Sequence, residues 1–149
     1  MKHTITNWPG SVARLLAVMG PLLLSACNAL PRYEPGLEDV SVQLVGLGTP
    51  SMCTKGVSYS LPVLETDGLR TTKVPTGQPI VFWNSMVFDG YQVNSRCAPA
   101  VPFTPAAGQR YLVNAGLADG KCFIEVVRED LARDTGLAPE PTIGRGSCL

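Results

Sequence analysis

Two Asp-Gly dipeptides, each flanked by strand-forming residues, constrain the fold of this chain most. Asp89-Gly90 follows the apolar run 80–88, and Asp119-Gly120 separates residues 111–117 from residues 122–127. Both residues of an Asp-Gly pair tolerate positive φ, which the tight turn of a β-hairpin requires. Each dipeptide therefore predicts a pair of antiparallel strands.

Further strand-length runs lie between glycine and proline turns. Residues 40–44 alternate apolar and polar side chains, and runs 57–64 and 69–74 follow before a turn at 75–79. The run 80–88 is the most apolar, which predicts a central strand buried on both faces. Many short runs between turns predict an all-β fold, a small antiparallel sandwich.

One segment departs from this alternation. Residues 128–134 contain helix formers and end shortly before Gly136. Their composition predicts one or two helical turns. The residues after Gly136, with two prolines and two glycines, predict an irregular tail.

Four cysteines are spread over the region of the predicted strands and the tail: Cys53, Cys97, Cys122 and Cys148. None belongs to a C-x-x-C pair, which argues against a thioredoxin-like redox site or a zinc ribbon. In an exported chain, four such cysteines predict two structural disulfides, for which three pairings exist. The sandwich is therefore expected to be stapled by disulfides.

The first residues have the order of a secretory signal. Lys2 and Arg14 precede an apolar run of about ten residues, which is half the length of a membrane-spanning helix. Ser25 and Ala26, both small, follow the run. This order predicts a cleaved signal peptide over residues 1–26.

The end of this signal, Leu24-Ser25-Ala26-Cys27, resembles the lipobox of bacterial lipoproteins. The resemblance implies a diacylglycerol thioether on the Cys27 sulfur, cleavage before Cys27, and acylation of the new amine, commonly with palmitate. The alternatives are an ordinary signal peptide with a chance cysteine, or a short buried helix. By resemblance to enterobacterial sorting, Asn28 in place of aspartate implies the outer membrane, facing the periplasm of a Gram-negative bacterium.

The rest of the chain divides into a lipidated N-terminus with a tether and one domain. Residues 27–38 carry prolines and a glycine without periodicity, and read as a tether that extends by about 3 Å per residue. Residues 39–149 are enough for a single domain with its own core. This domain is the predicted sandwich.

The segment 103–111 resembles the tyrosine corner of immunoglobulin-like and fibronectin-like sandwiches. The resemblance implies that Tyr111 opens a strand and hydrogen-bonds back across the loop before it. If so, Cys97 and Cys122 lie at the same end of the sandwich, which favours Cys97–Cys122 and leaves Cys53–Cys148 to tie down the tail. A bridge from Cys53 to Cys97 or to Cys122 remains the alternative.

Composition excludes several classes of function. The only histidine, His3, lies in the signal, so the exported chain has no imidazole for a catalytic triad and few ligands for zinc. Charge is nearly balanced, with no basic cluster for nucleic acid. No phosphate-binding or calcium-binding loop is found. We expect no metal and no cofactor besides the acyl chains on Cys27.

Neighbours on a strand point to opposite faces, so the adjacent pairs Glu38-Asp39 and Glu129-Asp130 are not expected to form a catalytic dyad, and Glu65 and Asp67 share a face but sit in a turn. All three pairs are predicted to be solvated surface groups. Trp83 and Tyr91 are candidates for a ligand groove or partner interface, with core packing as the alternative.

These observations favour a non-enzymatic envelope lipoprotein that is anchored to a membrane by its lipid and acts through an envelope protein partner. The alternative is an inhibitor or immunity lipoprotein against a lytic enzyme such as lysozyme, although the Ser-Gly-x-x-Tyr loop of common lysozyme inhibitors is missing. A third reading is a carboxylate-dependent hydrolase.

Overall fold

The computed structural model describes residues 29–89, 94–144 and 148. Its strands are β1 (Val40–Val45), β2 (Thr49–Thr54), β3 (Val57–Ser60), β4 (Leu64–Thr66), β5 (Leu69–Val74), β6 (Ile80–Asp89), β7 (Asn94–Cys97), β8 (Ala100–Phe103), β9 (Tyr111–Ala118), β10 (Lys121–Glu129) and β11 (Leu137–Pro139). Within these residues the fold is all-β, as predicted.

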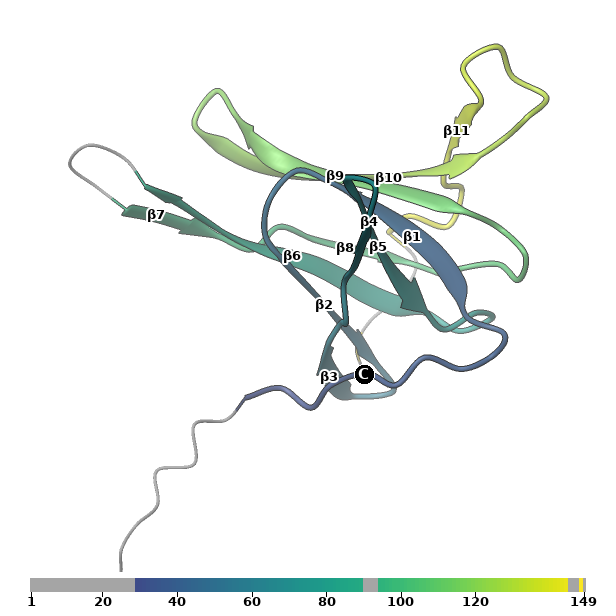
Figure 1. Cartoon of the computed structure of the whole chain (residues 1–149), viewed down its shortest axis with the longest axis horizontal. Coiled ribbons are helices and arrows are strands. Elements are labelled where there is room, and N and C mark those ends of the chain that lie inside the picture. Colours follow the sequence, from purple (N-terminus) through teal and green to yellow (C-terminus); the bar gives the residue numbers. More distant parts are fainter. Residues whose placement is uncertain (1–28, 90–93, 145–147, 149) are drawn as a thin grey trace, which may run out of the picture.

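The strands form two sheets that pack face to face as a small sandwich (Figure 1). One sheet has six strands in the order β11-β10-β9-β1-β5-β4. The other has five, in the order β3-β2-β6-β7, with β8 also paired to β6. Neighbouring strands are antiparallel except β1 and β9, which run parallel. The predicted sandwich is confirmed.

The alternation of apolar and polar residues builds the core between the sheets. Val40, Val42 and Leu44 of β1 point inward, while Ser41 and Gln43 point outward and are half-buried. The core contains residues of both sheets: Val40, Val42, Leu44, Met52, Leu61, Val74, Ile80, Phe82, Val101, Phe103, Tyr111, Val113 and Val126.

The central strand of the five-stranded sheet is β6, which pairs with β2 along one edge and with β8 and β7 along the other. Its inward residues Ile80 and Phe82 are fully buried. Its outward residues are not: Trp83 is half-buried and Val87 is exposed. The prediction that this strand is buried on both faces is therefore wrong, because its outward face has no complete covering layer among the described residues.

Of the two predicted Asp-Gly turns, one forms as expected and the other belongs to a longer loop. Asp119 and Gly120 have φ of 49° and 72°, and Ala118 pairs with Lys121, so this dipeptide forms the expected two-residue turn. The strands on either side of Asp89-Gly90 also form a hairpin, but Asp89 pairs with Asn94. The loop of that hairpin is therefore longer than the dipeptide and lies outside the described residues.

The predicted strand 57–64 is divided between the two sheets. Its first half is β3 of the five-stranded sheet, residues 61–63 are in no strand, and its last residue, Leu64, begins β4 of the six-stranded sheet. Pro62 lies between them and cannot donate a ladder hydrogen bond, so the chain leaves one sheet there and crosses to the other. The Pro62 carbonyl accepts a hydrogen bond from the Thr72 hydroxyl at 2.8 Å, which holds the crossing.

The predicted helical turns over 128–134 are not present. Residues 121–129 form one continuous strand, in which Arg128 pairs with Tyr111, and residues 131–136 form turns. The partner strand β9 pairs with residues 121–128 of β10, and the free energy of this long ladder outweighs the helix propensity of Arg128 and Glu129, which amounts to only tenths of a kcal/mol per residue.

The segment assigned to a tether also contacts the domain. The Tyr33 N–H donates to the Ser60 carbonyl, and the Ser60 N–H donates to the Pro31 carbonyl, each at 2.9 Å. Residues 31–33 thereby continue the edge of β3 through a parallel bridge. The ordered body therefore includes residues that precede the expected domain boundary at 39.

Candidate functional site

The outward face of the six-stranded sheet carries apolar side chains that remain in contact with solvent. Leu64 of β4, Leu69 of β5 and Leu137 of β11 are 65%, 53% and 37% exposed. The strand register places a row of outward residues across the sheet, from Leu64 through Thr71 and Gln43 to Leu112 of β9. This row is thus a mixed surface of leucines and uncharged polar groups.

Two cavities in the described part of the chain share residues with this face and with each other. The N-terminal cavity, about 450 Å³, is lined by residues 32–35 together with Pro62, Leu64 and Lys73. The C-terminal cavity, about 310 Å³, is lined by Gln43, Leu69, Arg110, Leu112 and residues 135–137. Ser41 and Thr71 line both cavities. The two therefore form one continuous surface, here named the outer trough, and each cavity has the size of a small-ligand or side-chain pocket.

The wall of the N-terminal cavity is the segment that contains Tyr33. The Tyr33 ring packs edge-on against Tyr59, with ring centroids 5.7 Å apart, and its hydroxyl donates to the Asp39 carboxylate at 2.8 Å. The same carboxylate oxygen accepts a second hydrogen bond from the Gly36 N–H at 2.9 Å. Burial raises the pKa of Tyr33 well above its ordinary value, and the hydrogen bond to Asp39 and its charge add to the effect. Tyr33 is therefore a neutral hydrogen-bond donor at neutral pH.

The wall of the C-terminal cavity is the turn after β10. The Asp130 N–H donates to the Gly136 carbonyl at 2.8 Å, which closes the turn. At its base, the Gln109 side-chain amide donates to the Glu129 carbonyl at 2.7 Å. Arg110 and Glu129 approach within 3.8 Å, but the Arg110 side chain is 74% exposed, so this ion pair contributes little to stability.

Charged groups of both signs rim the trough. Arg32, Glu34 and Lys73 surround the N-terminal cavity, while Arg110 and Glu129 lie at the C-terminal cavity. A neutral floor between charged rims resembles the usual composition of a protein interface, an apolar centre with a polar margin. Such a surface suits a segment of protein better than a highly charged ligand.

Trp83, one of the binding candidates drawn from the sequence, does not line the trough. Trp83 lies on the outward face of the other sheet. Tyr91 and the lipidation candidate Cys27 are outside the described residues.

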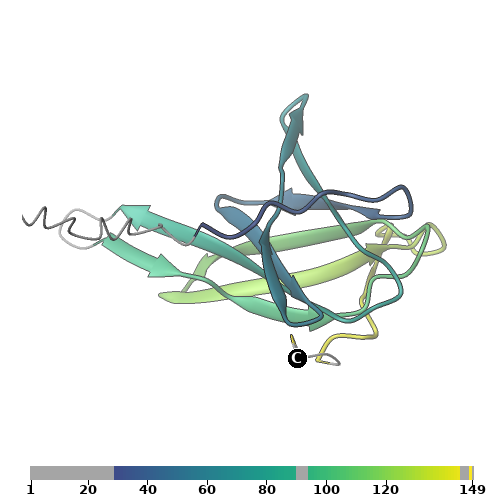
Figure 2. The ribbon, with the colours of Figure 1, turned by 90° about the horizontal axis from the view of Figure 1, so that it is seen from below.

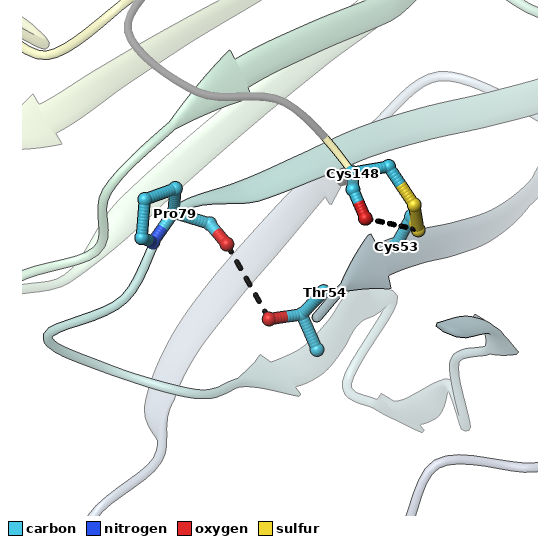
Figure 3. Close-up of a disulfide and its surroundings, with 4 residues drawn as sticks. All are labelled: Cys53, Thr54, Pro79 and Cys148. Carbon is cyan, nitrogen blue, oxygen red and sulfur yellow. Dashed lines mark hydrogen bonds between the residues drawn. A yellow bond between two sulfur atoms is a disulfide. The ribbon is translucent and has the colours of Figure 1, made fainter. Parts of the chain in front are cut away.

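The cysteines are paired as the sequence favoured, Cys97 with Cys122 and Cys53 with Cys148. The first pair joins β7 to the start of β10, with Cα atoms 6.3 Å apart, and so links one sheet to the other. The second pair, with Cα atoms 5.3 Å apart, ties the tail to β2 (Figure 3). Beside it, the Thr54 hydroxyl donates to the Pro79 carbonyl at 3.3 Å.

The acidic pairs have local roles in the described structure. Asp39 orders the segment around Tyr33, and Asp130 accepts a hydrogen bond from the Ala132 N–H at 3.1 Å within its turn. Glu65 and Asp67 are exposed on the β4–β5 hairpin. Asp39 and Asp130 thus act on the backbone conformation around them.

A buried carboxylate was not singled out from the sequence. Glu140 is 5% exposed, and its Oε1 accepts hydrogen bonds from the N–H and the hydroxyl of Thr142, at 2.9 Å and 2.5 Å. Thr142 in turn accepts from the Thr104 N–H at 2.9 Å. These bonds fasten the tail to the strand that ends at Phe103, so Glu140 is a structural group.

The trough residues Tyr33, Leu64, Leu69 and Leu137 were also missed. The only available signal was an apolar residue directly beside a turn: Leu69 follows Gly68 and Leu137 follows Gly136. Such positions are common at strand ends and carry no functional information alone. Which of them share a face depends on how β4, β5 and β11 enter one sheet.

Among residues 29–89, 94–144 and 148, no three His, Cys, Asp or Glu side chains cluster as metal ligands would. The same residues include no helix long and apolar enough to cross a membrane. No family model matches the chain, and no curated protein or solved structure is significantly similar to it.

Proposed function

We propose that this protein is a non-enzymatic lipoprotein of the cell envelope, anchored through acyl chains on Cys27, that binds a protein partner through the outer trough. The anchor rests on the lipobox-like residues before Cys27. A diacylated or triacylated cysteine gives stable membrane attachment, whereas one acyl chain is marginal. The outer membrane, facing the periplasm, is the membrane that Asn28 favours.

The observation that carries the binding role is the exposure of Leu64, Leu69 and Leu137 around the two connected cavities. Exposed leucines gathered on one face lower the free energy of association when a partner removes them from water, by about 25 cal/mol for each Å² of apolar surface. The charged rim then orients the partner, because unpaired charges oppose incorrect docking.

The first experiment is affinity capture of the full-length protein from crosslinked cell envelopes. The double variant Leu64→Ser/Leu69→Ser removes the apolar lining of the trough, and Leu47→Ser is its control, because Leu47 is 76% exposed but does not line either cavity. A specific protein captured by wild type and by Leu47→Ser, but lost from the double variant, supports the trough as the interface. Equal capture by all three variants would exclude it.

The anchor is tested separately. Mass spectrometry of the N-terminal peptide is expected to show Cys27 with its lipid, and Cys27→Ala should leave the protein unprocessed or soluble. An unmodified Cys27 in protein purified from membranes would refute the lipid anchor.

A second candidate is an inhibitor or immunity lipoprotein against a lytic enzyme. It is favoured by the β4–β5 hairpin, which stands away from the body of the sandwich (Figure 2). A projecting hairpin with Glu65 and Asp67 near its tip has the shape to enter an enzyme cleft. Inhibition of a purified cell-wall hydrolase by wild type, lost on replacing Glu65 and Asp67 by Ser, would favour this reading over an accessory subunit.

A further inference from the structure

The segment before β1 is bound to the sandwich near its start and held in shape by its own hydrogen bonds near its end. At its start, Pro31 and Tyr33 share two backbone hydrogen bonds with Ser60, both 2.9 Å long. At its end, Asp39 holds the Tyr33 hydroxyl and the Gly36 N–H. The Tyr33 ring also packs against the hydrophobic core. We name residues 31–39 the clasp.

The clasp decides how far the domain can move from an anchor at Cys27. With the clasp bound, only residues 27–30 connect the anchor to the domain, and they span at most about 14 Å when fully extended. With the clasp released, the connection runs to Val40 and spans at most about 45 Å. The maximal distance between Cys27 and the domain therefore differs about threefold between the two states. The contacts of Tyr33 and Asp39 favour the state with the shorter distance.

We propose that the clasp keeps the domain at the surface of the membrane in which Cys27 is anchored, with the N-terminal cavity of the outer trough beside the bilayer. This inference rests on the lipid anchor of the proposed function. Arg32 and Tyr33, which line that cavity, follow the connecting residues directly. The trough therefore meets partners that are presented at the same membrane surface, and a partner well away from that surface is out of its reach.

The clasp also forms part of the N-terminal cavity, so binding in that cavity depends on the state of the clasp. Residues 32–35 form a wall of the N-terminal cavity, so release of the clasp removes that wall. A partner segment that fills the cavity binds the clasped state better than the released state. By linkage, the bound partner stabilises the clasped state by the same free energy that the clasp adds to the binding of the partner.

The test measures the distance of the domain from the bilayer. Trp8 lies in the signal, so Trp83 is the single tryptophan of the lipidated protein and can serve as an energy-transfer donor. The purified lipoprotein is reconstituted into vesicles that carry a dansyl-labelled phospholipid as acceptor. Tyr33→Pro/Asp39→Ala disrupts the clasp, because it removes the Tyr33 ring, the Tyr33 N–H that bonds to Ser60, and the Asp39 carboxylate. An insertion of eight Gly/Ser residues between Leu30 and Pro31 lengthens the connection while the clasp stays intact.

Wild type is expected to show strong transfer, and both altered proteins should fall below about half of it, because their maximal reach grows by about 30 Å. Leu131→Ala, an 87% exposed residue outside the clasp, is the control and should match wild type. Unchanged transfer in the clasp variant, or in the insertion variant, would overturn the inference.

Different results would refute the proposed lipid anchor and the proposed role of the clasp. Mass spectrometry of the same preparation reports the lipid on Cys27 before reconstitution. Protein without lipid refutes the proposed anchor and the inference with it. If the protein carries its lipid but energy transfer is the same in wild type and in the clasp variant, the inference is refuted and the anchor is not. Circular dichroism of Tyr33→Pro/Asp39→Ala should retain the wild-type β-sheet spectrum. A lost spectrum would show that residues 31–39 belong to the folding core and not to a releasable clasp.

Discussion

The phenolic oxygen of Tyr111 accepts a hydrogen bond from the backbone N–H of Ala106 at 2.9 Å. Tyr111 is the first residue of β9, and its ring packs 5.4 Å from that of Phe103, the last residue of β8. The bond therefore closes the loop that joins the two sheets at this end of the sandwich. Because Arg110 of that loop lines the outer trough, the contact also positions one rim of the candidate site.

Tyr111→Phe should lower the free energy of unfolding by about 1 kcal/mol, since it removes one hydrogen bond and keeps the ring. Tyr111→Leu also removes the ring packed on Phe103 and should cost more. Urea unfolding followed by circular dichroism measures both. A Phe variant as stable as wild type would mean that water replaces the tyrosine hydroxyl at the Ala106 N–H without loss.

The two disulfides should differ in their contribution to stability. Cys53 and Cys148 are separated by 95 positions, Cys97 and Cys122 by 25. In the chain-entropy model, removal of the first by paired Cys→Ala changes costs about 4.7 kcal/mol and removal of the second about 3.5 kcal/mol. Urea unfolding of the two double variants checks the order. The reverse order would show that native-state contacts outweigh loop entropy here.

Gly48→Ala should destabilise the crossing between β1 and β2. Gly48 has φ of 125°, and an added Cβ would lie 2.7 Å from the side chain of Asn84, whose amide donates to the Leu47 carbonyl at 2.8 Å. We expect a loss of at least about 2 kcal/mol.

Gly68→Ala is the matched control for this change. Gly68 also has positive φ, at 75°, but nothing lies within 4 Å of its added Cβ, so the cost should be near 1 kcal/mol. Thermal unfolding of both variants separates backbone strain from steric overlap. Equal losses would show that Asn84 can move aside.

Stability should fall at alkaline pH because of two tyrosines. Burial raises the pKa of Tyr33 and of Tyr111 above the ordinary value of 10.0. A raised pKa means that the folded state holds the proton more tightly than the unfolded state does. The resulting stability is complete below pH 10.0 and is lost as the pH rises towards the folded-state pKa values.

The measurement for this prediction is urea unfolding at a series of pH values from about 8 to 11. Tyr33→Phe/Tyr111→Phe should show a shallower fall than wild type above pH 10.0, because both ionising groups are gone. An equally steep fall in the double variant would assign the loss to other groups. Phenolate absorbance followed in parallel should place part of the wild-type titration above the ordinary range.

Much of the fold could be predicted from local sequence patterns, and each prediction that was wrong has a physical cause. Turn chemistry predicted the hairpin at Asp119-Gly120, where two positive φ angles are needed in adjacent residues. It did not predict the crossing at Pro62, because the run 57–64 is continuous in its strand-forming pattern. The helix expected over 128–134 failed because β9 supplies a partner for residues 121–128 of β10, which no local pattern reports.

The candidate site was less accessible than the fold. Trp83 was singled out because it is aromatic and lies in an apolar run, yet the register of β6 turns it outward on the sheet opposite the trough. Tyr33 was assigned to a tether because residues 31–38 have no periodicity. Its role comes from contacts with Tyr59, Ser60 and Asp39, which neither proline content nor alternation encodes.

Local patterns were enough to predict the all-β class, the inward face of β1 and the presence of two disulfides, because side-chain alternation, turn residues and cysteine number act locally. The neighbours of each strand could not be predicted in this way. The tertiary structure placed β1 between β5 and β9, gathered Leu64, Leu69 and Leu137 on one outward face, and folded the residues before β1 back onto β3. Such neighbour relations depend on the packing free energy of the whole sandwich, to which residues far apart in the chain contribute together.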